Sequence, residues 1–537
     1  MTASAYPPSG SSLLERVLAE QRELTAVERF AQHHRDAEEP LLAAHYRELL
    51  PTERSPGAGE QFAFRVDLDA CTGCKACVTA CHSLNGLRPD EAWREVGLVV
   101  DVGTSAGDQQ TVTTACHHCI DPGCLRGCPA QAYEKDSITG IVRHLDDQCI
   151  GCQYCVLTCP YDVPSFDASL GIVRKCDLCA DRLSSGEAPA CAQGCPTSAI
   201  SIDIVSTTAE PGALLSGLDP YLPDSSLTRP TTRYVSARPA RPIVPADAAL
   251  VKPNHAHAPL AFMLVFVQLS TGILVLDAVA RGTVGPAASG RLGLLAFALG
   301  AAVIGLAGSI AHLGRPTQAF RAVLGWRTSW MSREILAFGA YLAALCAAVL
   351  AEALGNGAVV ARWAALLAGI VATACSIGVY AATGRAWWSA GRTIAAFGST
   401  QLLLGGAGML CVTVVAALSA GAPSSGRLLV GGLFAVVVGG ASLVRVQRFT
   451  ETPASGHDLE RSRSLLRGPL RSSVHARVAV TAVGLLLVVA AVGSSLVGSD
   501  LPAAGVAGLA LLTLTLGEFL DRRLFFAAEA ARAMPGL

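Results

Sequence analysis

The sequence of 537 residues predicts an α+β domain followed by an all-α bundle that crosses a membrane. Three observations support this division. Sixteen of the 19 cysteines lie between Cys71 and Cys195. The chain after Lys252 contains no lysine and consists largely of Ala, Leu, Val and Gly. Only 15% of all residues are charged, which suits a protein that lies partly in lipid, and the length exceeds that of one ordinary domain.

Four regions are expected along the chain. Residues 1–60 form an N-terminal extension, in which Ser12 and Glu15 have the spacing of a capping box before a helix. Such a helix either packs on the same chain or docks a partner subunit. Residues 61–205 hold the cysteines, and residues 206–256 are rich in Pro, Ser and Thr, as in an extended linker. Residues 257–537 form the membrane part.

The cysteines are expected to bind metal. Neither a twin-Arg pair nor a long apolar stretch occurs near the N-terminus, so we expect no signal peptide and a reducing, cytosolic setting. Disulfides are rare there, which favours metal ligation. The net charge of −1 gives no indication of a nucleic-acid partner. Cys346, Cys375 and Cys411 lie singly in apolar segments and are expected to be small buried hydrophobes.

The sixteen clustered cysteines form four runs. These are Cys71, Cys74, Cys77 and Cys81; Cys116, Cys119, Cys124 and Cys128; Cys149, Cys152, Cys155 and Cys159; and Cys176, Cys179, Cys191 and Cys195. The first and third runs have the ferredoxin spacing C-x2-C-x2-C-x3-C, in which three thiolates wrap one cubane and the fourth binds a neighbouring cluster. The second and fourth runs have the same pattern with insertions.

Four thiolates for each cubane give four [4Fe-4S] clusters in a ferredoxin-like α+β domain. Structural zinc is the alternative, but zinc sites use two separated CxxC pairs rather than triple runs that end in Cys-Pro. His117 and His118 lie inside the second run. They either donate hydrogen bonds that tune a cluster or are ordinary loop residues.

The membrane part contains eight apolar segments of sufficient length to span a bilayer. They lie near 259–280, 291–312, 335–355, 359–381, 397–418, 428–445, 477–497 and 502–520. Counting helices from the cluster domain places sixteen of the twenty arginines after residue 257 on the cluster side. The positive-inside rule therefore predicts a multi-pass protein of the cytoplasmic membrane with its clusters facing the cytoplasm.

The cluster side of the bundle also gathers polar residues suited to quinone chemistry. His312 and Arg315 lie at the end of the second segment, and Glu334 lies at the start of the third. A quinol that gives up electrons and protons needs acceptors such as His or Glu near a cluster. The alternative is that these residues cap helices or extend to the interface. Weaker candidates are Gln268, Asp277 and Glu518.

Other residues of the bundle have simpler interpretations. Trp326, Trp330, Trp387 and Trp388 are expected to form an aromatic belt at the membrane surface. Haem b would require paired axial histidines inside the bundle. Only His312 and His475 are expected near helix ends, both at the same surface, so the sequence predicts no haem.

The cysteine runs resemble those of the four-cluster iron–sulfur subunit of the dimethyl-sulfoxide-reductase family over residues 65–205. The matching phrases are CTGCKAC, CHHCIDPGCLRGCPAQA, CIGCQYCVLTCPYDVP and KCDLCADRLSSGEAPACAQGCPTSAI. The resemblance implies four ligand sets. These are Cys71, Cys74, Cys77 and Cys195 (set 1); Cys116, Cys119, Cys124 and Cys159 (set 2); Cys128, Cys149, Cys152 and Cys155 (set 3); and Cys81, Cys176, Cys179 and Cys191 (set 4).

The apolar half resembles the eight-helix membrane anchor subunit of the same family, in the phrases HAHAPLAFMLVFVQLSTG, HLGRPTQAFRAVLGWRTSWMSREI, VYAATGRAWWSAGRT and EFLDRRLFF. The resemblance implies a quinol site at His312 and Glu334, with menaquinol or ubiquinol as the exchangeable substrate. It also implies a molybdopterin catalytic subunit as partner, since no molybdopterin site is recognisable in this chain.

Electron flow from quinol through the clusters to a cytoplasmic partner is the expected function. Two alternatives stay open. One is the reverse flow, in which a formate-dehydrogenase-like partner supplies electrons that reduce quinone. The other is a structural or ion-conducting anchor without a quinone site, to which the intramembrane carboxylates Asp277 and Glu352 point.

Overall fold

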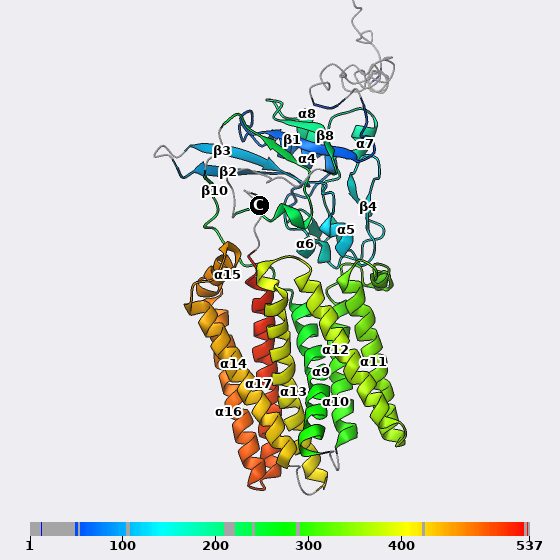
Figure 1. The fold of residues 1–537 in the computed structure, drawn as a ribbon, viewed down its shortest axis with the longest axis vertical. Helices are drawn as coiled ribbons and strands as arrows, with labels where there is room; N and C mark the ends of the chain where they lie inside the picture. The colour runs from blue at the N-terminus through cyan, green and yellow to red at the C-terminus, as the bar shows by residue number, and fades with distance from the viewer. Residues whose placement is uncertain are drawn as a thin grey trace, which may run out of the picture.

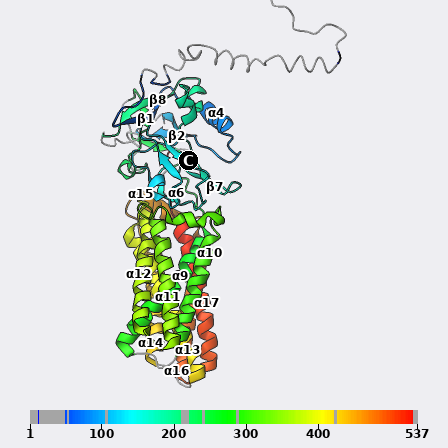
Figure 2. The same cartoon turned by 90° about the vertical axis from the view of Figure 1, so that its right-hand side faces the viewer.

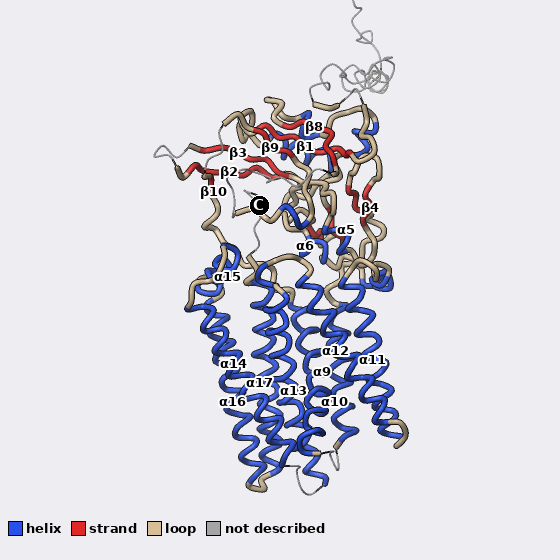
Figure 3. Tube along the Cα trace, viewed as in Figure 1, coloured by secondary structure: helices blue, strands red, loops and turns tan. Residues whose placement is uncertain are grey.

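The computed structural model describes residues 12, 49–51, 54–103, 108–208, 221–238, 242–285, 290–420, 425–530 and 534. A region of small sheets and short helices stands on one end of a long helical bundle (Figures 1 and 2). All described strands lie in the upper region and the bundle is helical (Figure 3). The predicted fold class, an α+β ferredoxin-like region joined to eight membrane-spanning helices, is confirmed. The helix predicted around Ser12 and Glu15 lies outside the described residues, apart from Ser12 itself.

Two three-stranded sheets frame the upper region. In the first, β1 (Glu60–Asp67) pairs antiparallel with β8 (Ile200–Ser206) and parallel with β9 (Arg233–Val235). In the second, β2 (Glu95–Asp101) lies between β3 (Gln109–Thr114) and β10 (Ile243–Pro245). Two hairpins complete the strands: β4 (Tyr133–Lys135) with β5 (Val142–His144), and β6 (Ser165–Asp167) with β7 (Ile172–Arg174). The pairing of β1 with β8 brings the two ends of the cysteine-rich segment together.

Each cysteine run is followed or interrupted by a short helix. The helices are α4 (Ala76–Asn85), α5 (Gly123–Gly127), α6 (Tyr154–Thr158), α7 (Ala180–Ser184) and α8 (Ala190–Gln193). Helix α4 packs on α8, and α5 packs on α6. The first run therefore lies beside the fourth, and the second run lies beside the third.

Residues 206–256 are more than a connection over the surface. Their described parts contain η1 (Ser225–Leu227) and the strands β9 and β10. These strands extend both sheets before the chain enters the bundle. The extended character expected from the composition is present, but the backbone hydrogen bonds are made to the cluster region.

The described residues of the bundle contain eight helices that are long and apolar enough to cross a membrane, as predicted. They are α9 (Ala258–Val284), α10 (Arg291–Ile310), α11 (Trp330–Leu354), α12 (Ala358–Ala381), α13 (Ala390–Ala420), α14 (Ser425–Glu451), α16 (Arg471–Leu496) and α17 (Asp500–Ala527). On the cluster side, η2 (Pro316–Val323), η3 (Ala386–Trp388) and α15 (His457–Arg467) connect them. Helix α9 is the most enclosed and packs against α10, α13 and α17.

Two expectations about the bundle were wrong. Trp388 is not part of a surface belt, because it is 1% exposed and donates its indole N–H to the Phe525 carbonyl at 3.0 Å. Cys346 is exposed on the outside of the bundle rather than buried in it. An apolar segment predicts burial in either protein or lipid, and the sequence does not distinguish the two.

Candidate functional site

All four cysteine runs share one backbone turn. The residue before the second cysteine has a positive φ in every run: 71° at Gly73, 41° at His118, 69° at Gly151 and 61° at Leu178. Only glycine adopts this region without strain, so His118 and Leu178 are held there by their surroundings. The repeated turn aims the two flanking cysteines to the same side. The structure thus shows that the inserted second and fourth runs use the same local geometry as the ferredoxin-type runs.

A second turn follows the Cys-Pro pairs. Gln131 and Ser198, each three residues after a cysteine, have φ values of 54° and 51°. The next amide then donates to the sulfur: Ala132 to Cys128 at 3.2 Å, and Ala199 to Cys195 at 3.3 Å. Hydrogen bonds from backbone amides to cysteine sulfur stabilise its anionic form, and such bonds help to set the potential of a bound cluster.

The thiols gather in four groups. Burial raises the pKa of most of them, and negative charge on neighbouring thiols raises it further. The mutual neighbours are Cys116, Cys119, Cys124 and Cys159; Cys128, Cys149, Cys152 and Cys155; Cys81, Cys176, Cys179 and Cys191; and Cys77 with Cys195. Neighbours also join different sets, since Cys77 is close to Cys191 and Cys176 is close to Cys116.

The spacing of the thiols within each of the four groups bears on the kind of metal site that they form. Within the described ranges, no group of three or more His, Cys, Asp or Glu side chains closes on a point where one metal ion could sit. A single zinc ion draws thiolates to ~2.3 Å, whereas a cubane spreads four thiolates over four irons. Groups of neighbouring thiols with amide donors to sulfur fit the ligation of iron–sulfur clusters.

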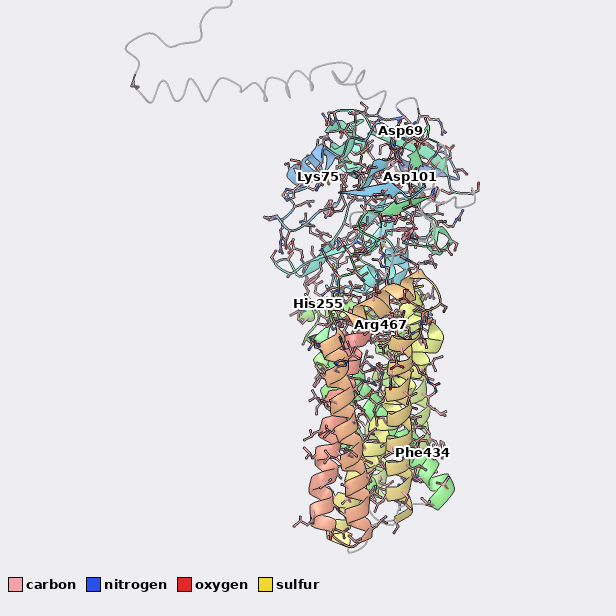
Figure 4. The ribbon with its side chains drawn as sticks, turned by 90° about the vertical axis from the view of Figure 1, so that its left-hand side faces the viewer. Asp69, Lys75, Asp101, His255, Phe434 and Arg467 are labelled. Carbon is pink, nitrogen blue, oxygen red and sulfur yellow. The ribbon has the colours of Figure 1, made fainter. Side chains whose placement is uncertain are left out.

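The four groups differ in depth. Within set 1, Cys74 is exposed and Cys71 and Cys195 are half-buried. In set 3, three of the four cysteines are buried, and Cys152 packs against the core of the helical bundle. Figure 4 shows Lys75, the neighbour of Cys74, in the cluster region well away from the bundle, and His255 and Arg467 near the junction with the bundle. Set 3 is thus next to the membrane part, and set 1 is remote from it.

Two buried cations lie among the thiols, and the sequence interpretation missed both. Arg94 and Lys175 are 2% and 3% exposed. Burial acts to lower the pKa of each, but the thiols of Cys176 and its neighbours raise it above the ordinary value. Lys175 could have been noticed because it directly precedes Cys176. Both positive charges offset the negative charge that thiolates and clusters would place inside the domain.

We expect Lys175→Met to lower the midpoint potential of a cluster in set 2 or set 4. Removing one buried charge at several ångströms changes the reduction energy by on the order of 100 mV, and reduction becomes harder. A redox titration followed by electron paramagnetic resonance measures the shift. Lys252→Met, at an exposed position before α9, is the matched control. An unchanged set of potentials in a variant with full iron content would contradict this role.

His117 and His118 are buried residues rather than surface loop residues. His117 is 2% exposed and shares a hydrogen bond of 2.8 Å between its Nδ1 and the Thr232 hydroxyl. His118 Nδ1 accepts from the Val142 amide at 3.0 Å. Burial lowers the pKa of His117 to about 3 and that of His118 well below its usual value, so both are neutral. The two histidines fix the loop of the second run.

One contact between the third run and the bundle is made by backbone atoms. The amide of Gly314 donates to the Gly151 carbonyl at 3.3 Å, and the amide of Arg315 donates to the Ile150 carbonyl at 3.1 Å. Gly171 closes the contact, because a side chain at Gly314 would collide with its backbone. The loop between α10 and α11 therefore lies directly on the cysteine loop of set 3.

A second contact lies on the other side of the same cysteine run. The hydroxyl of Tyr154 donates to the Val379 carbonyl at 2.7 Å. Arg385 donates to the carbonyls of Leu157 and Cys159 at 3.0 and 3.3 Å, and it also pairs with Glu529. The third run is thus held by the loop after α10, by the end of α12 and by Arg385.

The three predicted quinol residues lie at this junction but are not joined to one another. His312 Nδ1 bonds the Ser309 carbonyl, and its Nε2 is buried without a partner among the described residues. Burial lowers the pKa of His312, which leaves the ring neutral. Arg315 donates to the Asp146 carbonyl at 2.7 Å and so holds the junction. No hydrogen bond or ion pair in the described part of the chain connects His312 with Glu334.

The Glu334 side chain is buried at a position apart from His312. It is 7% exposed, and its Oε1 has no hydrogen-bond partner among the described residues. Its neighbours are Ser376 and Tyr380 of α12 and Tyr154 of the third cysteine run. The run therefore reaches the His312 loop through Gly151 and the surroundings of Glu334 through Tyr154.

His257 is a further residue that the sequence interpretation missed. It directly precedes α9, and His312 is close enough to act on its charge. Burial is the main cause that lowers the pKa of His257 to about 4. The phrase HAHAP immediately before the first apolar segment was the available signal.

The weaker quinol-site candidates lie elsewhere in the bundle. Gln268 and Glu518 belong to one buried polar network, and Asp277 pairs with Arg281 and Arg427 at the far end.

These features define the class of protein: an iron–sulfur protein joined to a membrane-spanning anchor. Residues 108–204 match the 4Fe-4S dicluster domain family, and residues 254–527 match the family described as DMSO reductase anchor subunit (DmsC). Since the second match spans half of the chain, the protein belongs to the DMSO reductase anchor subunit family. The resemblance of both halves that the sequence predicted is confirmed.

The cysteine-rich half is similar to curated iron–sulfur proteins. It is 36% identical over 169 residues to the formate dehydrogenase-O iron-sulfur subunit of Escherichia coli (strain K12), covering 28% of this chain and 56% of that protein. It is 31% identical over 207 residues to one component of the anaerobic dimethyl sulfoxide reductase of the same organism, covering 36% of this chain and 98% of that component. The chain thus spans about half the length of the formate dehydrogenase subunit and nearly all of the reductase component.

Proposed function

We propose that this protein carries electrons between membrane quinol and a molybdopterin catalytic subunit through four [4Fe-4S] clusters. The observation that carries the proposal is the junction, where the third cysteine run contacts the His312 loop and places its Tyr154 beside Glu334. When bound, the clusters would accept electrons one at a time. The protein's own residues position quinol, accept its protons and exclude water between the bundle and the third run.

The proposed cluster ligands are the four sets given above. The order of the sets runs from set 3, against the bundle, through set 2 and set 4 to set 1. Cys124 of set 2 belongs to the same hydrophobic cluster as the buried cysteines of set 3. Cys176 of set 4 lies near Cys116 of set 2, and Cys77 of set 1 lies near Cys191 of set 4, so consecutive sets adjoin. Such a series suits stepwise electron transfer across the domain. The half-exposed cysteines of set 1 mark the end that the catalytic partner would cover.

Electron flow from quinol to the catalytic subunit is favoured over the reverse direction. The anchor half matches the anchor of a DMSO reductase, an enzyme whose name implies a reduced substrate. The reverse flow, quinone reduction for a formate-dehydrogenase-like partner, draws on the similarity of the cysteine half to formate dehydrogenase subunits. Cluster potentials measured against those of menaquinol and ubiquinol distinguish the two directions.

The clusters are proposed to face the cytoplasm. The four arginines of the far side are not free loop charges: Arg281 and Arg427 pair with Asp277, and Arg291 and Arg362 pair with Glu352. The remaining positive charge of the bundle therefore gathers on the cluster side, as the positive-inside rule requires for a cytoplasmic face. The same pairing weakens the ion-conducting alternative, since the carboxylates of Asp277 and Glu352 are already paired with arginines.

His312→Ala and Glu334→Gln test the quinol site. We expect each change to slow quinol-dependent cluster reduction by about 100-fold, the usual range for loss of a proton acceptor. Reduction by dithionite should stay unchanged, because it does not need the bundle. Stopped-flow absorption of the clusters in detergent-solubilised protein gives both rates, with His475→Ala at an exposed position of α16 as control. Wild-type rates in both variants would exclude the proposed site.

A further inference from the structure

A buried ion cluster lies inside the bundle, and the proposed quinol site does not use it. Arg477 of α16 and Arg522 of α17 are fully buried, and Glu518 is 1% exposed. Asp521 forms an ion pair with Arg477 at 3.2 Å and accepts a hydrogen bond from Arg522 at 3.4 Å. Glu518 lies 3.9 Å from Arg477. Ionisable side chains are costly inside a membrane protein and mark functional sites by default.

The ion cluster is only partly satisfied by the protein. Nη1 of Arg477, Nε of Arg522 and Oε1 of Glu518 are buried without a hydrogen-bond partner among the described residues. The amide nitrogen of Gln268, which lies beside Arg522, is also buried without a hydrogen-bond partner among the described residues. Buried polar atoms of this kind are normally satisfied by ordered water. Donors and acceptors that share water form a path along which protons can move.

Tyr380 links this cluster to the proposed quinol site. Tyr380 and Arg522 pack against the same ring, because the Tyr380 ring lies 5.1 Å from the Phe525 ring and the Arg522 guanidinium lies 5.8 Å from it. The Glu334 carboxylate also acts on Tyr380, so Tyr380 is close to both residues. The Arg522 guanidinium also donates to the Thr400 hydroxyl, which in turn donates to Glu518 at 2.5 Å. The series Glu334, Tyr380, Arg522 and Glu518 crosses the bundle near the cluster side.

The residues of this series reach water on the cluster side of the bundle. The Asp521 side chain is 14% exposed, and Arg445 of α14 is close enough to act on its charge. At the far end of the bundle, four arginines surround Asp277 and Glu352. Asp521 lies near the cluster-side end of α17, so the partly exposed end of the series opens on that side.

We propose that Tyr380 and the Arg477–Glu518–Asp521–Arg522 cluster carry the protons of quinol oxidation away from Glu334 to the cluster side of the membrane. The inference rests on the proposed function. Each quinol gives up two electrons, which pass to the clusters, and two protons. Glu334 accepts one proton and passes it through Tyr380 and ordered water to Glu518 before it accepts the second. Asp521 then releases each proton to water, and the product is quinone.

The test uses Tyr380→Phe and Glu518→Gln in the full chain with its clusters. Tyr380→Phe keeps the aromatic packing and every ion pair, so it removes the hydroxyl without loss of folding. We expect quinol-dependent cluster reduction to fall at least 10-fold in both variants, with a larger solvent isotope effect because proton transfer becomes limiting. Glu352→Gln, which alters a paired carboxylate at the far end, is the control.

Two further readouts separate a proton route from a structural role. Binding of a fluorescent quinol analogue and reduction by dithionite should be unchanged in the variants, since neither requires a proton to leave Glu334. A pH profile reports on Glu518, which faces Arg477, Arg522, Asp521 and Thr400, with Arg445 beyond Asp521. We expect the slowed rate of Tyr380→Phe to recover partly at high pH, where hydroxide accepts the proton.

The outcomes distinguish the inference from the function on which it rests. An active wild type whose rate and isotope effect are unchanged in both variants overturns the proton route and leaves the quinol site standing. Weakened binding of the analogue in Tyr380→Phe would assign this residue to quinol binding and also overturn the route. A wild type that quinol does not reduce refutes the proposed function, and the route falls with it.

Discussion

Cys155→Ala is expected to remove one cluster and to abolish quinol-dependent reduction of the others. Cys155 is a buried member of set 3, the group of thiols that lies against the bundle. Loss of one of four thiolates should release the cubane, so that iron falls from about sixteen to about twelve per chain. With the cluster nearest the membrane gone, electrons from quinol have no acceptor within reach of the remaining sets.

The measurement combines iron analysis of anaerobically purified protein with stopped-flow reduction by quinol and by dithionite. Dithionite should still reduce the three remaining clusters, which shows that the domain is folded. Cys346→Ala, at the exposed outer face of α11, is the matched control and should keep full iron content and activity. Quinol-dependent reduction of Cys155→Ala at the wild-type rate would show that electrons enter elsewhere.

Gly314→Val is expected to uncouple the two halves of the protein while both remain folded. A Cβ at this position would lie 2.6 Å from the carbonyl carbon and 2.8 Å from the Cα of Gly171, distances that no side chain tolerates. Because the obstacle is backbone, the loop must move away and the bonds to Ile150 and Gly151 must break. Electron transfer falls steeply with separation, so we expect quinol-dependent reduction to drop by about 100-fold or more, similar to other misplacements of reacting groups.

Iron content and dithionite reduction should be unchanged in Gly314→Val, because no thiol lies on the displaced loop. Gly339→Val provides the control, since no atom lies within 4 Å of a Cβ at that position of α11. A normal quinol-dependent rate in Gly314→Val would show that the junction adjusts by moving the third cysteine run as well.

Much of the fold could be predicted because its signals are local. The spacing within each cysteine run depends on a single turn, and the structure repeats that turn at Gly73, His118, Gly151 and Leu178. The eight apolar segments are each long enough to be recognised without their neighbours. Several predicted ends are short by a few residues, as in 397–418 against Ala390–Ala420, because polar residues at helix ends continue the helix beyond the lipid. The predicted segment 291–312 instead runs beyond the observed helix Arg291–Ile310.

The parts that could not be predicted depend on contacts between distant segments. Arg94 precedes the second run without any spacing that relates it to a thiol, yet it is buried beside Cys77 and Cys191. Tyr380 and Arg522 are separated by more than a hundred residues and meet only when α12 and α17 pack around α13. Residue type alone places Trp388 at the membrane surface, whereas the structure buries it. A residue type indicates what a side chain can do, but tertiary packing decides what it contacts.

The strands β9 and β10 have a consequence for assembly. They belong to the segment that joins the cluster region to the anchor, and they complete sheets on the cluster side before α9 begins. An encounter between two separate subunits depends on the concentration of each, whereas a covalent tether keeps the two surfaces at a high effective concentration. Dilution in detergent should therefore leave this pair associated at a ratio of one to one. Cells that make this chain also need no mechanism to balance the synthesis of its two halves.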